Sequence, residues 1–335
     1  MAVLSLFDGI SCGQLALQRA GIKVDRYLSE VDKYAIKITQ KNFPNTEQLG
    51  DVKNVWAKNL PKIDLLIGGS PCQDLSIAKV GRKGLDGERS GLFWHYVRLL
   101  RTCKPKYFLL ENVASMSREN RDKITEVLGV EPIMINSALV SAQQRKRLYW
   151  TNIPNITQPE DKGLVLADIL ENGLPYEQKA KALTASYDGA IIKNSLERKQ
   201  RTMVFNPYNN KLNTGKSASL GTNPQCQTSK WGQVVIKPIQ LVGGGQAQRV
   251  YAVKGKSICL STNGGGAKTG LYKIDLPDGQ YTVRKLTPIE CERLQTLPDN
   301  YTQGISNTQR YKCIGNGWTV DVVAHIFKNL RGLNE

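Results

Sequence analysis

Cys72 has the clearest chemical potential in this sequence, because a thiolate is a strong nucleophile and this thiol follows a short apolar run and a proline. Residues 64–67 are typical of a buried strand, Gly68 and Gly69 permit a sharp turn, and Pro71 fixes its own φ angle. Such a turn presents the thiol at the carboxyl end of a strand, which is where open α/β sheets bind ligands. Free cysteine is also among the most buried residue types, so the nucleophile hypothesis depends on the neighbouring residues.

Three further groups of polar residues are predicted to lie at strand ends. Glu111 follows an apolar run, Gln143, Arg145 and Arg147 precede another, and Asn316 precedes the last helical pattern. A thiol, a carboxyl group and a guanidinium in one pocket suit chemistry on a pyrimidine ring. Addition of a thiolate to C6 of cytosine turns C5 into a carbon that can take a methyl group. A donor at N3 and a cation at O2 stabilise the electron density that this addition places on the ring.

The first predicted strand ends in a glycine-containing turn that predicts an adenosyl cofactor. The turn, Phe7-Asp-Gly-Ile-Ser-Cys-Gly13, lacks the second and third glycines of Gly-x-Gly-x-x-Gly, which serve a pyrophosphate and close helix packing. Glu30, at the end of the second strand, is placed to accept hydrogen bonds from ribose hydroxyls. Asp51, after the third strand, is placed to hold the adenine amino group. Together these residues predict S-adenosylmethionine.

The elements that must position these residues alternate between apolar runs and helical patterns over residues 2–150, which is typical of βαβ units and a parallel sheet. Near the end of the chain, Thr287, Pro288 and Glu290 form a helix-start signal. Residues 319–330 predict a helix that packs back on the sheet. The predicted strands are 3–7, 24–29, 64–67, 107–111, 133–139 and 148–150.

The positive charge is concentrated in one part of the chain. The formal net charge is +17, and the segment from Lys181 to Lys273 has fourteen Lys or Arg residues against two acids. Because the composition shifts near Asp161 to Gly, Asn, Ser and Thr, we predict a second, irregular, β-rich domain that binds nucleic acid phosphates.

Two other classes of site are not indicated. The seven cysteines are odd in number and scattered without a Cys-x-x-Cys pair, so we expect neither a disulfide framework nor a metal site. No apolar run has transmembrane length and the first residues lack the features of a signal peptide, so we expect a cytoplasmic protein without a membrane partner.

In order along nearly the whole chain, these residues resemble the motifs of the DNA cytosine-5 methyltransferases. The matching segments are Phe7-x-Gly9, Glu30, Asp51, Pro71-Cys72-Gln73, Glu111-Asn112-Val113, Gln143-x-Arg145-x-Arg147, Arg284-x-Leu-Thr-Pro-x-Glu-x-x-Arg-Leu-Gln295 and Gly315-Asn316. Ser11-Cys12 and Ala142 differ from many members of the family. Both differences occur in the de novo vertebrate branch and its phage and bacterial relatives, which the chain resembles most.

The resemblance implies a fold, a substrate and a set of partners. The expected fold class is α/β: a Rossmann-like S-adenosylmethionine-dependent methyltransferase domain, residues 1–165 plus 305–335, and a smaller irregular β-rich target-recognition domain, residues 166–304. The expected partner is double-stranded DNA, bound in a sequence-specific way by a monomer. The protein is expected to be encoded by a bacterium or phage and associated with the nucleoid.

The resemblance also implies roles for matched residues. Cys72 adds to C6 of a flipped cytosine, Glu111 hydrogen-bonds or protonates N3, and Arg147 binds O2, with Arg145 and Gln143 supporting the pocket. Residues 76–90 resemble the family's mobile loop that closes over DNA. The expected cofactor contacts are Phe7, Gly9, Glu30, Asp51, Val52, Pro71, Leu92 and Asn316.

Three alternative functions are compatible with parts of this pattern. A cytosine-5 methyltransferase of the same fold acts on transfer RNA, although a large basic recognition segment favours DNA. A non-catalytic DNA-binding relative would retain the fold, but the presence of Cys72, Glu111 and Arg147 argues against it. A nicotinamide-dependent oxidoreductase is disfavoured because the phosphate-binding glycines are missing.

Overall fold

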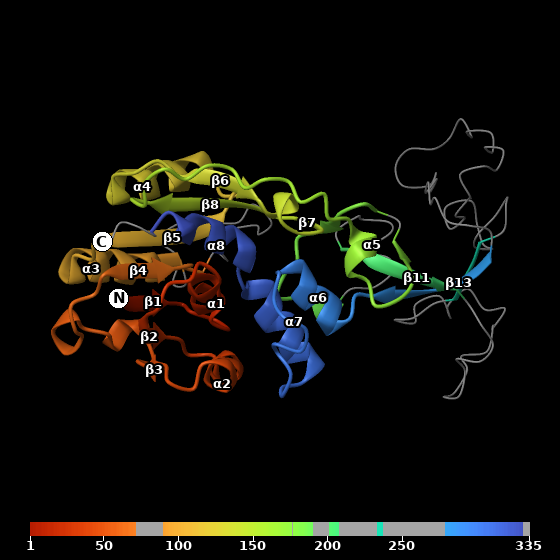
Figure 1. Cartoon of the computed structure of the whole chain (residues 1–335), viewed down its shortest axis with the longest axis horizontal. Helices are drawn as coiled ribbons and strands as arrows, with labels where there is room; N and C mark the ends of the chain where they lie inside the picture. Colours follow the sequence, from red (N-terminus) through yellow and green to blue (C-terminus); the bar gives the residue numbers. More distant parts are fainter. Residues whose placement is uncertain (72–89, 176, 190–200, 208–232, 237–278, 331–335) are drawn as a thin grey trace.

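A seven-stranded sheet forms the centre of the larger part of the molecule (Figure 1). The computed structural model describes residues 1–71, 90–175, 177–189, 201–207, 233–236 and 279–330. The predicted α/β fold class is confirmed. The predicted strands are found with small shifts of their ends, except that residues 137–139 of the strand predicted over 133–139 form a 3₁₀ helix. The order across the sheet is β3 (Glu47–Gln48), β2 (Asp25–Ser29), β1 (Ala2–Leu6), β4 (Leu65–Gly68), β5 (Tyr107–Val113), β8 (Lys146–Thr151) and β6 (Ile133–Asn136).

One strand departs from the predicted parallel arrangement. Strand β8 lies between β5 and β6 and is antiparallel to both, whereas β1 to β5 pair in parallel. The physical reason is the short connection from β6, which holds only the 3₁₀ helix η5 (Ser137–Leu139) and β7 (Gln143–Gln144). A parallel neighbour needs a crossover of a dozen or more residues, so the chain returns in the opposite direction.

The strands are apolar on both faces because helices cover both sides of the sheet (Figure 1). Alternate residues point to opposite sides: Val3 joins one core and Leu4 the other, and Ile67 and Leu66 divide in the same way. The first core is completed by α1 (Cys12–Arg19), α2 (Lys33–Asn42) and α8 (Val320–Lys328). The second is completed by α3 (Phe93–Cys103) and α4 (Arg118–Leu128).

The C-terminal helix closes the sheet domain as the sequence predicts. Helix α8 presents Val322, Val323 and Ile326 to the first core. Its first turn is tied to α1 by an ion pair of 2.7 Å between Arg19 and Asp321. The last helix of the chain therefore packs against its first helix.

A smaller, β-rich part lies at the other end of the molecule (Figure 1). Its four-stranded antiparallel sheet has the order β12 (Gln233–Ile236), β13 (Gly279–Lys285), β11 (Met203–Pro207) and β9 (Leu174–Pro175). Between this sheet and the larger one lie α5 (Leu166–Ile169), α6 (Pro288–Leu294) and α7 (Asn307–Asn316). The strand β10 (Ala180–Lys181) pairs with β7, and η6 (Tyr187–Gly189) contacts α7. The domain boundaries stay a prediction, and most of the basic segment lies outside the described residues.

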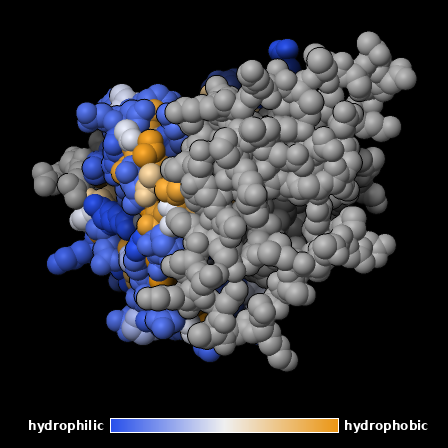
Figure 2. Space-filling model, turned by 90° about the vertical axis from the view of Figure 1, so that its right-hand side faces the viewer, coloured by the Kyte–Doolittle hydropathy of each residue, from blue (hydrophilic) through white to orange (hydrophobic). Residues whose placement is uncertain are grey.

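The described residues that are visible in Figure 2 form a largely hydrophilic surface, which is interrupted by a narrow band of hydrophobic residues. Within the described residues, no helix combines the length and the apolar character that crossing a membrane requires.

Helix α6 begins at the predicted signal and carries two buried acids. Thr287 and Glu290 form the reciprocal cap, and Glu292 is completely buried. The Glu292 carboxylate accepts hydrogen bonds from the backbone N–H groups of Asn300 and Thr302, at 2.7 and 2.8 Å. Arg310 on α7 donates to the same carboxylate at 2.9 Å. The buried charge is therefore fully paired, and it joins α6, α7 and the turn at residues 300–302.

Arg310→Met is expected to lower the free energy of unfolding by about 3–5 kcal/mol, because it leaves Glu292 charged and unpaired in the interior. Urea unfolding at pH 7 measures the loss. Asp299→Asn, which breaks the partly exposed ion pair between Arg293 and Asp299, is the control and is expected to cost at most about 1 kcal/mol. Equal losses for the two variants would contradict the role given to Arg310.

Candidate active site

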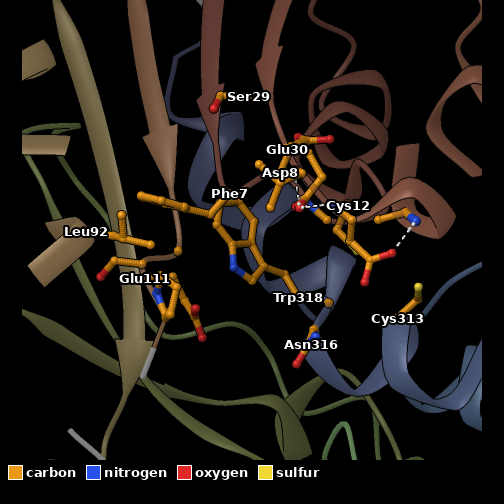
Figure 3. A pocket seen from close by; sticks show the side chains of 18 of the residues that line it. Phe7, Asp8, Cys12, Ser29, Glu30, Leu92, Glu111, Cys313, Asn316 and Trp318 are labelled. Carbon is orange, nitrogen blue, oxygen red and sulfur yellow. Dashed lines mark hydrogen bonds between the residues drawn. The ribbon is translucent and has the colours of Figure 1, made fainter. Parts of the chain in front are cut away.

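A pocket of about 500 Å³ opens at the carboxyl edge of the parallel strands. Its lining comes from the ends of β1, β2, β4 and β5, from residues 51–53, and from the connection between α7 and α8. In Figure 3, Phe7, Asp8 and Glu30 lie on one side of the pocket, Leu92 and Glu111 on another, and the Trp318 side chain between them.

The structure brings most of the predicted site residues to this pocket. Glu111, Arg145 and Arg147 line it, together with all eight predicted cofactor residues: Phe7, Gly9, Glu30, Asp51, Val52, Pro71, Leu92 and Asn316. Gln143 does not line it. Cys72 and residues 76–89 of the predicted closing loop lie outside the described residues, but Pro71, which precedes Cys72, is at the pocket wall.

The turn after β1 has an unusual backbone. Phe7, Gly9 and Ser11 have φ angles of 57°, 61° and 60°, and the first and last of these are strained because their side chains disfavour the left-handed region. The Glu30 carboxylate accepts the Gly9 N–H at 2.8 Å and also the N–H groups of Val31 and Asp32, at 2.7 and 2.9 Å. The end of β2 therefore holds the turn in the shape that opens the pocket.

Asp8 is a pocket residue that the sequence analysis did not select. It accepts hydrogen bonds from Ser5 Oγ, at 2.6 Å, and from Ser11 Oγ. Burial raises the pKa of Asp8 to about 7, and the hydrogen bonds from the two serines only partly offset this effect. The motif Phe7-Asp-Gly9 contained the residue, but its burial depends on the fold and not on the motif.

Glu111 and Arg147 form the central charged pair of the pocket. Arg147 Nε lies 2.8 Å from Glu111 Oε1, and both side chains are mostly buried. Glu111 pairs with Tyr149 in the antiparallel register, so Arg147, two residues before Tyr149, is its diagonal neighbour on the same face. The two side chains therefore present a carboxyl group and a guanidinium next to each other at the edge of the sheet.

Arg145 and Gln143 tie the pocket to the smaller part of the molecule. The Arg145 guanidinium donates to the Leu183 carbonyl at 2.8 Å and to the Gly317 carbonyl at 2.9 Å. The Gln143 side chain accepts the Leu183 N–H and donates to the Leu294 carbonyl, both at 2.9 Å. Because Gln143 is completely buried, its contribution is to position neighbouring segments, whereas Arg145 does this and also reaches the pocket wall.

Asn112 and Trp318, which had no role in the sequence-based hypothesis, lie against the segment before Cys72. Asn112 donates to the Ser70 carbonyl and hydroxyl at 3.3 and 3.2 Å. A Cβ atom on Gly69 would lie 2.9 Å from Trp318 Nε1 and 3.2 Å from Glu111 Oε2, so only glycine permits this close approach. Trp318 and Glu111 thus meet at the end of β4.

The two cysteines that line the pocket among the described residues are unsuited to nucleophilic chemistry. Cys12 and Cys313 both line the pocket. Burial raises the pKa of each thiol to about 12, so both stay protonated near neutral pH.

Comparisons with known proteins find methyltransferases that match this chain over nearly its whole length. A family model described as C-5 cytosine-specific DNA methylase matches residues 1–332. The type II methyltransferase M.HhaI of Haemophilus parahaemolyticus is 30% identical over 348 residues, which cover 98% of this chain and 93% of that protein. The orphan methyltransferase M.SPRI of Bacillus phage SPR is 27% identical, with coverage of 98% and 97%. The solved structure of the Entamoeba histolytica methyltransferase EhMeth matches with a TM-score of 0.62, at 17% identity, over 99% of each chain.

Asp8→Asn is expected to change how stability depends on pH. Because folding raises the pKa of Asp8 from 3.8 to about 7, the folded protein binds a proton between these pH values that the unfolded chain does not. This contribution to stability is present below pH 4, falls as the pH rises to 7 and is absent above it. The variant lacks this loss, so relative to wild type it should gain about 1–3 kcal/mol between pH 5 and pH 8.

Thermal unfolding of both proteins across this pH range measures the effect. Asp122→Asn, at an exposed acid on α4, is the matched control and should follow the wild-type pH profile. Parallel profiles for wild type and Asp8→Asn would contradict the titration of Asp8 near pH 7.

Proposed function

The chain belongs to the C-5 cytosine-specific DNA methylase family, and from that premise we propose that it transfers a methyl group from S-adenosylmethionine to C5 of a flipped cytosine in duplex DNA. The family predicted from the motifs is confirmed, and with it the assignment to the DNA cytosine-5 methyltransferases. The observation that carries the finer proposal is the Glu111–Arg147 pair, which lies at the wall of the pocket that the predicted cofactor residues line.

The residues of the pocket fit S-adenosylmethionine. Asp8, Glu30, Asp32 and Asp51 gather on the side formed by β1 to β3, where Lys53 is the one basic lining residue among those described. An acidic lining repels the phosphates of a dinucleotide and attracts the cationic sulfonium and ammonium groups of S-adenosylmethionine. When bound, this cofactor supplies an electrophilic methyl group.

Individual residues would hold defined parts of this ligand. Glu30 Oε2 accepts one N–H, from Gly9, which leaves a lone pair for a ribose hydroxyl. Asp51 and Val52 would hold the adenine ring, and Phe7 and Leu92 supply apolar walls. These assignments account for the absence of the phosphate-binding glycines.

The reacting end of the pocket matches the edge of cytosine. N3 and O2 of the base are both bonded to C2 and so lie side by side, and Glu111 and Arg147 are neighbours at 2.8 Å. Glu111 would donate a proton or hydrogen bond to N3, and Arg147 would bind O2. Both interactions stabilise the electron density that nucleophilic addition pushes onto the ring.

The proposed reaction proceeds through a covalent adduct of Cys72. Its thiolate forms a bond to C6, C5 takes the methyl group, and the bond from that methyl group to the sulfonium sulfur breaks. A base then removes the proton from C5, and the electron pair released expels the Cys72 thiolate. Because C5 and C6 are covered by neighbouring bases in a duplex, the cytosine must leave the stack. Residues 166–304, with their basic segment, would bind the duplex, and we propose that one monomer acts on each site.

Cys72→Ser is expected to abolish methylation while S-adenosylmethionine and DNA still bind. With duplex DNA that contains 5-fluorocytosine, wild type should form a covalent adduct, because fluorine at C5 cannot leave as a proton does. This adduct should survive denaturing gel electrophoresis. The variant should form none. Methyl transfer by Cys72→Ser at the wild-type rate would refute the covalent mechanism.

Duplex DNA is expected to be the preferred substrate over transfer RNA, because the segment from Lys181 to Lys273 has fourteen Lys or Arg residues against two acids. Competition between the two nucleic acids for transfer of a tritiated methyl group measures this preference. Bisulfite sequencing of a methylated plasmid then identifies the target sequence. If transfer RNA is methylated and no DNA duplex is, transfer RNA is the substrate and the proposed DNA substrate is wrong.

A further inference from the structure

The turn that carries Asp51 and Val52 into the pocket is held by side chains on both sides. At its start, the Asp51 carboxylate accepts the Lys53 N–H at 2.9 Å and caps the 3₁₀ helix η1 (Val52–Asn54). Within this turn, the Val52 carbonyl already accepts the Val55 N–H at 3.3 Å. A carbonyl oxygen has two lone pairs, so the Val52 carbonyl can accept a second donor, and the Val55 carbonyl, just after the helix, can also accept donors.

Arg98 on α3 supplies these donors. Its Nη2 donates to the Val52 carbonyl at 3.0 Å and its Nη1 to the Val55 carbonyl at 2.8 Å. The guanidinium carbon also lies 4.6 Å from the centre of the Trp56 ring. A planar guanidinium that bonds two carbonyls and stacks on an aromatic ring is confined in all directions. Arg98 thus fixes the path of residues 52–56.

The segment that leads directly into α3 also forms part of the pocket wall. Leu92 lines the pocket in the 3₁₀ helix η4 (Ser90–Leu92), directly before Phe93, the first residue of α3. Phe93 and Val97 share the core that buries Val52. Helix α3 therefore sets both the Leu92 wall and, through Arg98, the Asp51–Val52 wall.

We propose that Arg98 is a positioning residue for the adenosyl end of the cofactor. Without contacting the ligand, it holds the Val52 and Val55 carbonyls so that Asp51 and Val52 face the pocket, and it keeps this wall in register with Leu92. The inference rests on the proposed function, because it takes S-adenosylmethionine as the ligand. It adds a residue that no motif of the family resemblance contains.

Arg98→Met is expected to weaken binding of S-adenosylmethionine about 10- to 100-fold, because the variant keeps an unbranched apolar stem and loses both donors. Titration calorimetry without DNA measures the dissociation constant. The kcat at saturating cofactor and the affinity for duplex DNA are expected to stay within about twofold of wild type.

Binding of two cofactor analogues distinguishes a local effect of Arg98 from a general loss of structure. Because the proposed effect is confined to the adenosyl end, the fold loss should be the same for S-adenosylhomocysteine and for 5′-methylthioadenosine, which lacks the amino acid tail. A general loss of structure would instead lower the melting temperature and affect DNA binding as well.

Two further variants keep the test decisive. Arg98→Lys retains the charge with a single donor group and should show an intermediate loss of affinity, so it carries the test if Arg98→Met does not fold. Arg101→Met, at an exposed arginine of the same helix, is the matched control and should bind as wild type does. The proposal would be overturned if Arg98→Lys, and Arg98→Met where it folds, bound S-adenosylmethionine with wild-type affinity. It would also be overturned if Arg101→Met lost as much affinity as the Arg98 variants.

Measuring cofactor binding without DNA distinguishes failure of the Arg98 proposal from failure of the proposed function. A wild-type protein that binds S-adenosylmethionine but methylates no duplex would refute the proposed function and leave the Arg98 assignment supported by its binding data. A wild-type protein that does not bind the cofactor would overturn both.

Discussion

The reversed direction of β8 determines where the charged pair of Glu111 and Arg147 lies. In a wholly parallel sheet, Arg147, at the start of its strand, would lie at the amino edge, far from Glu111. Because β8 is antiparallel to β5, its start meets the end of β5 and the two side chains pair at 2.8 Å. The same reversal brings Arg145 to the connection between α7 and α8. One short connection after β6 thus assembles residues that are far apart in the sequence.

The distribution of charge separates two binding tasks within one molecule. The chain is strongly basic, yet the charged residues that line the pocket wall formed by β1 to β3 are mainly acids. Burial of Asp8 keeps part of this acidity protonated near neutral pH, so the lining does not repel itself fully. A cationic ligand is favoured inside the pocket, and a polyanion is favoured at the basic segment. This arrangement is physically consistent with a small cationic methyl donor and a nucleic acid substrate.

Local patterns predicted what depends on local physics. The apolar runs predicted the main strands, and the cap at Thr287 predicted the start of α6, because side-chain periodicity and backbone capping are encoded within a few residues. The strand-end residues Phe7, Glu30 and Asp51 were found because parallel strands end at a common edge. The antiparallel direction of β8 was missed, since strand direction follows from connection length and sheet order and not from the residues of the strand.

The residues that hold the site together were the least predictable, and the reason is common to all of them. Arg98 and Asn112 act mainly on backbone groups of distant segments, the Val52 carbonyl and the Ser70 carbonyl. Gln143, whose supporting role only the family resemblance implied, likewise binds a distant backbone group, the Leu183 N–H. A backbone group has no residue type, so no sequence pattern shows which one a side chain will bind. Such bonds set the positions of neighbouring reactive or ligand-binding side chains. Loss of one of them can therefore reproduce the kinetic defect of a lost ligand contact, although the altered residue touches neither the cofactor nor the base.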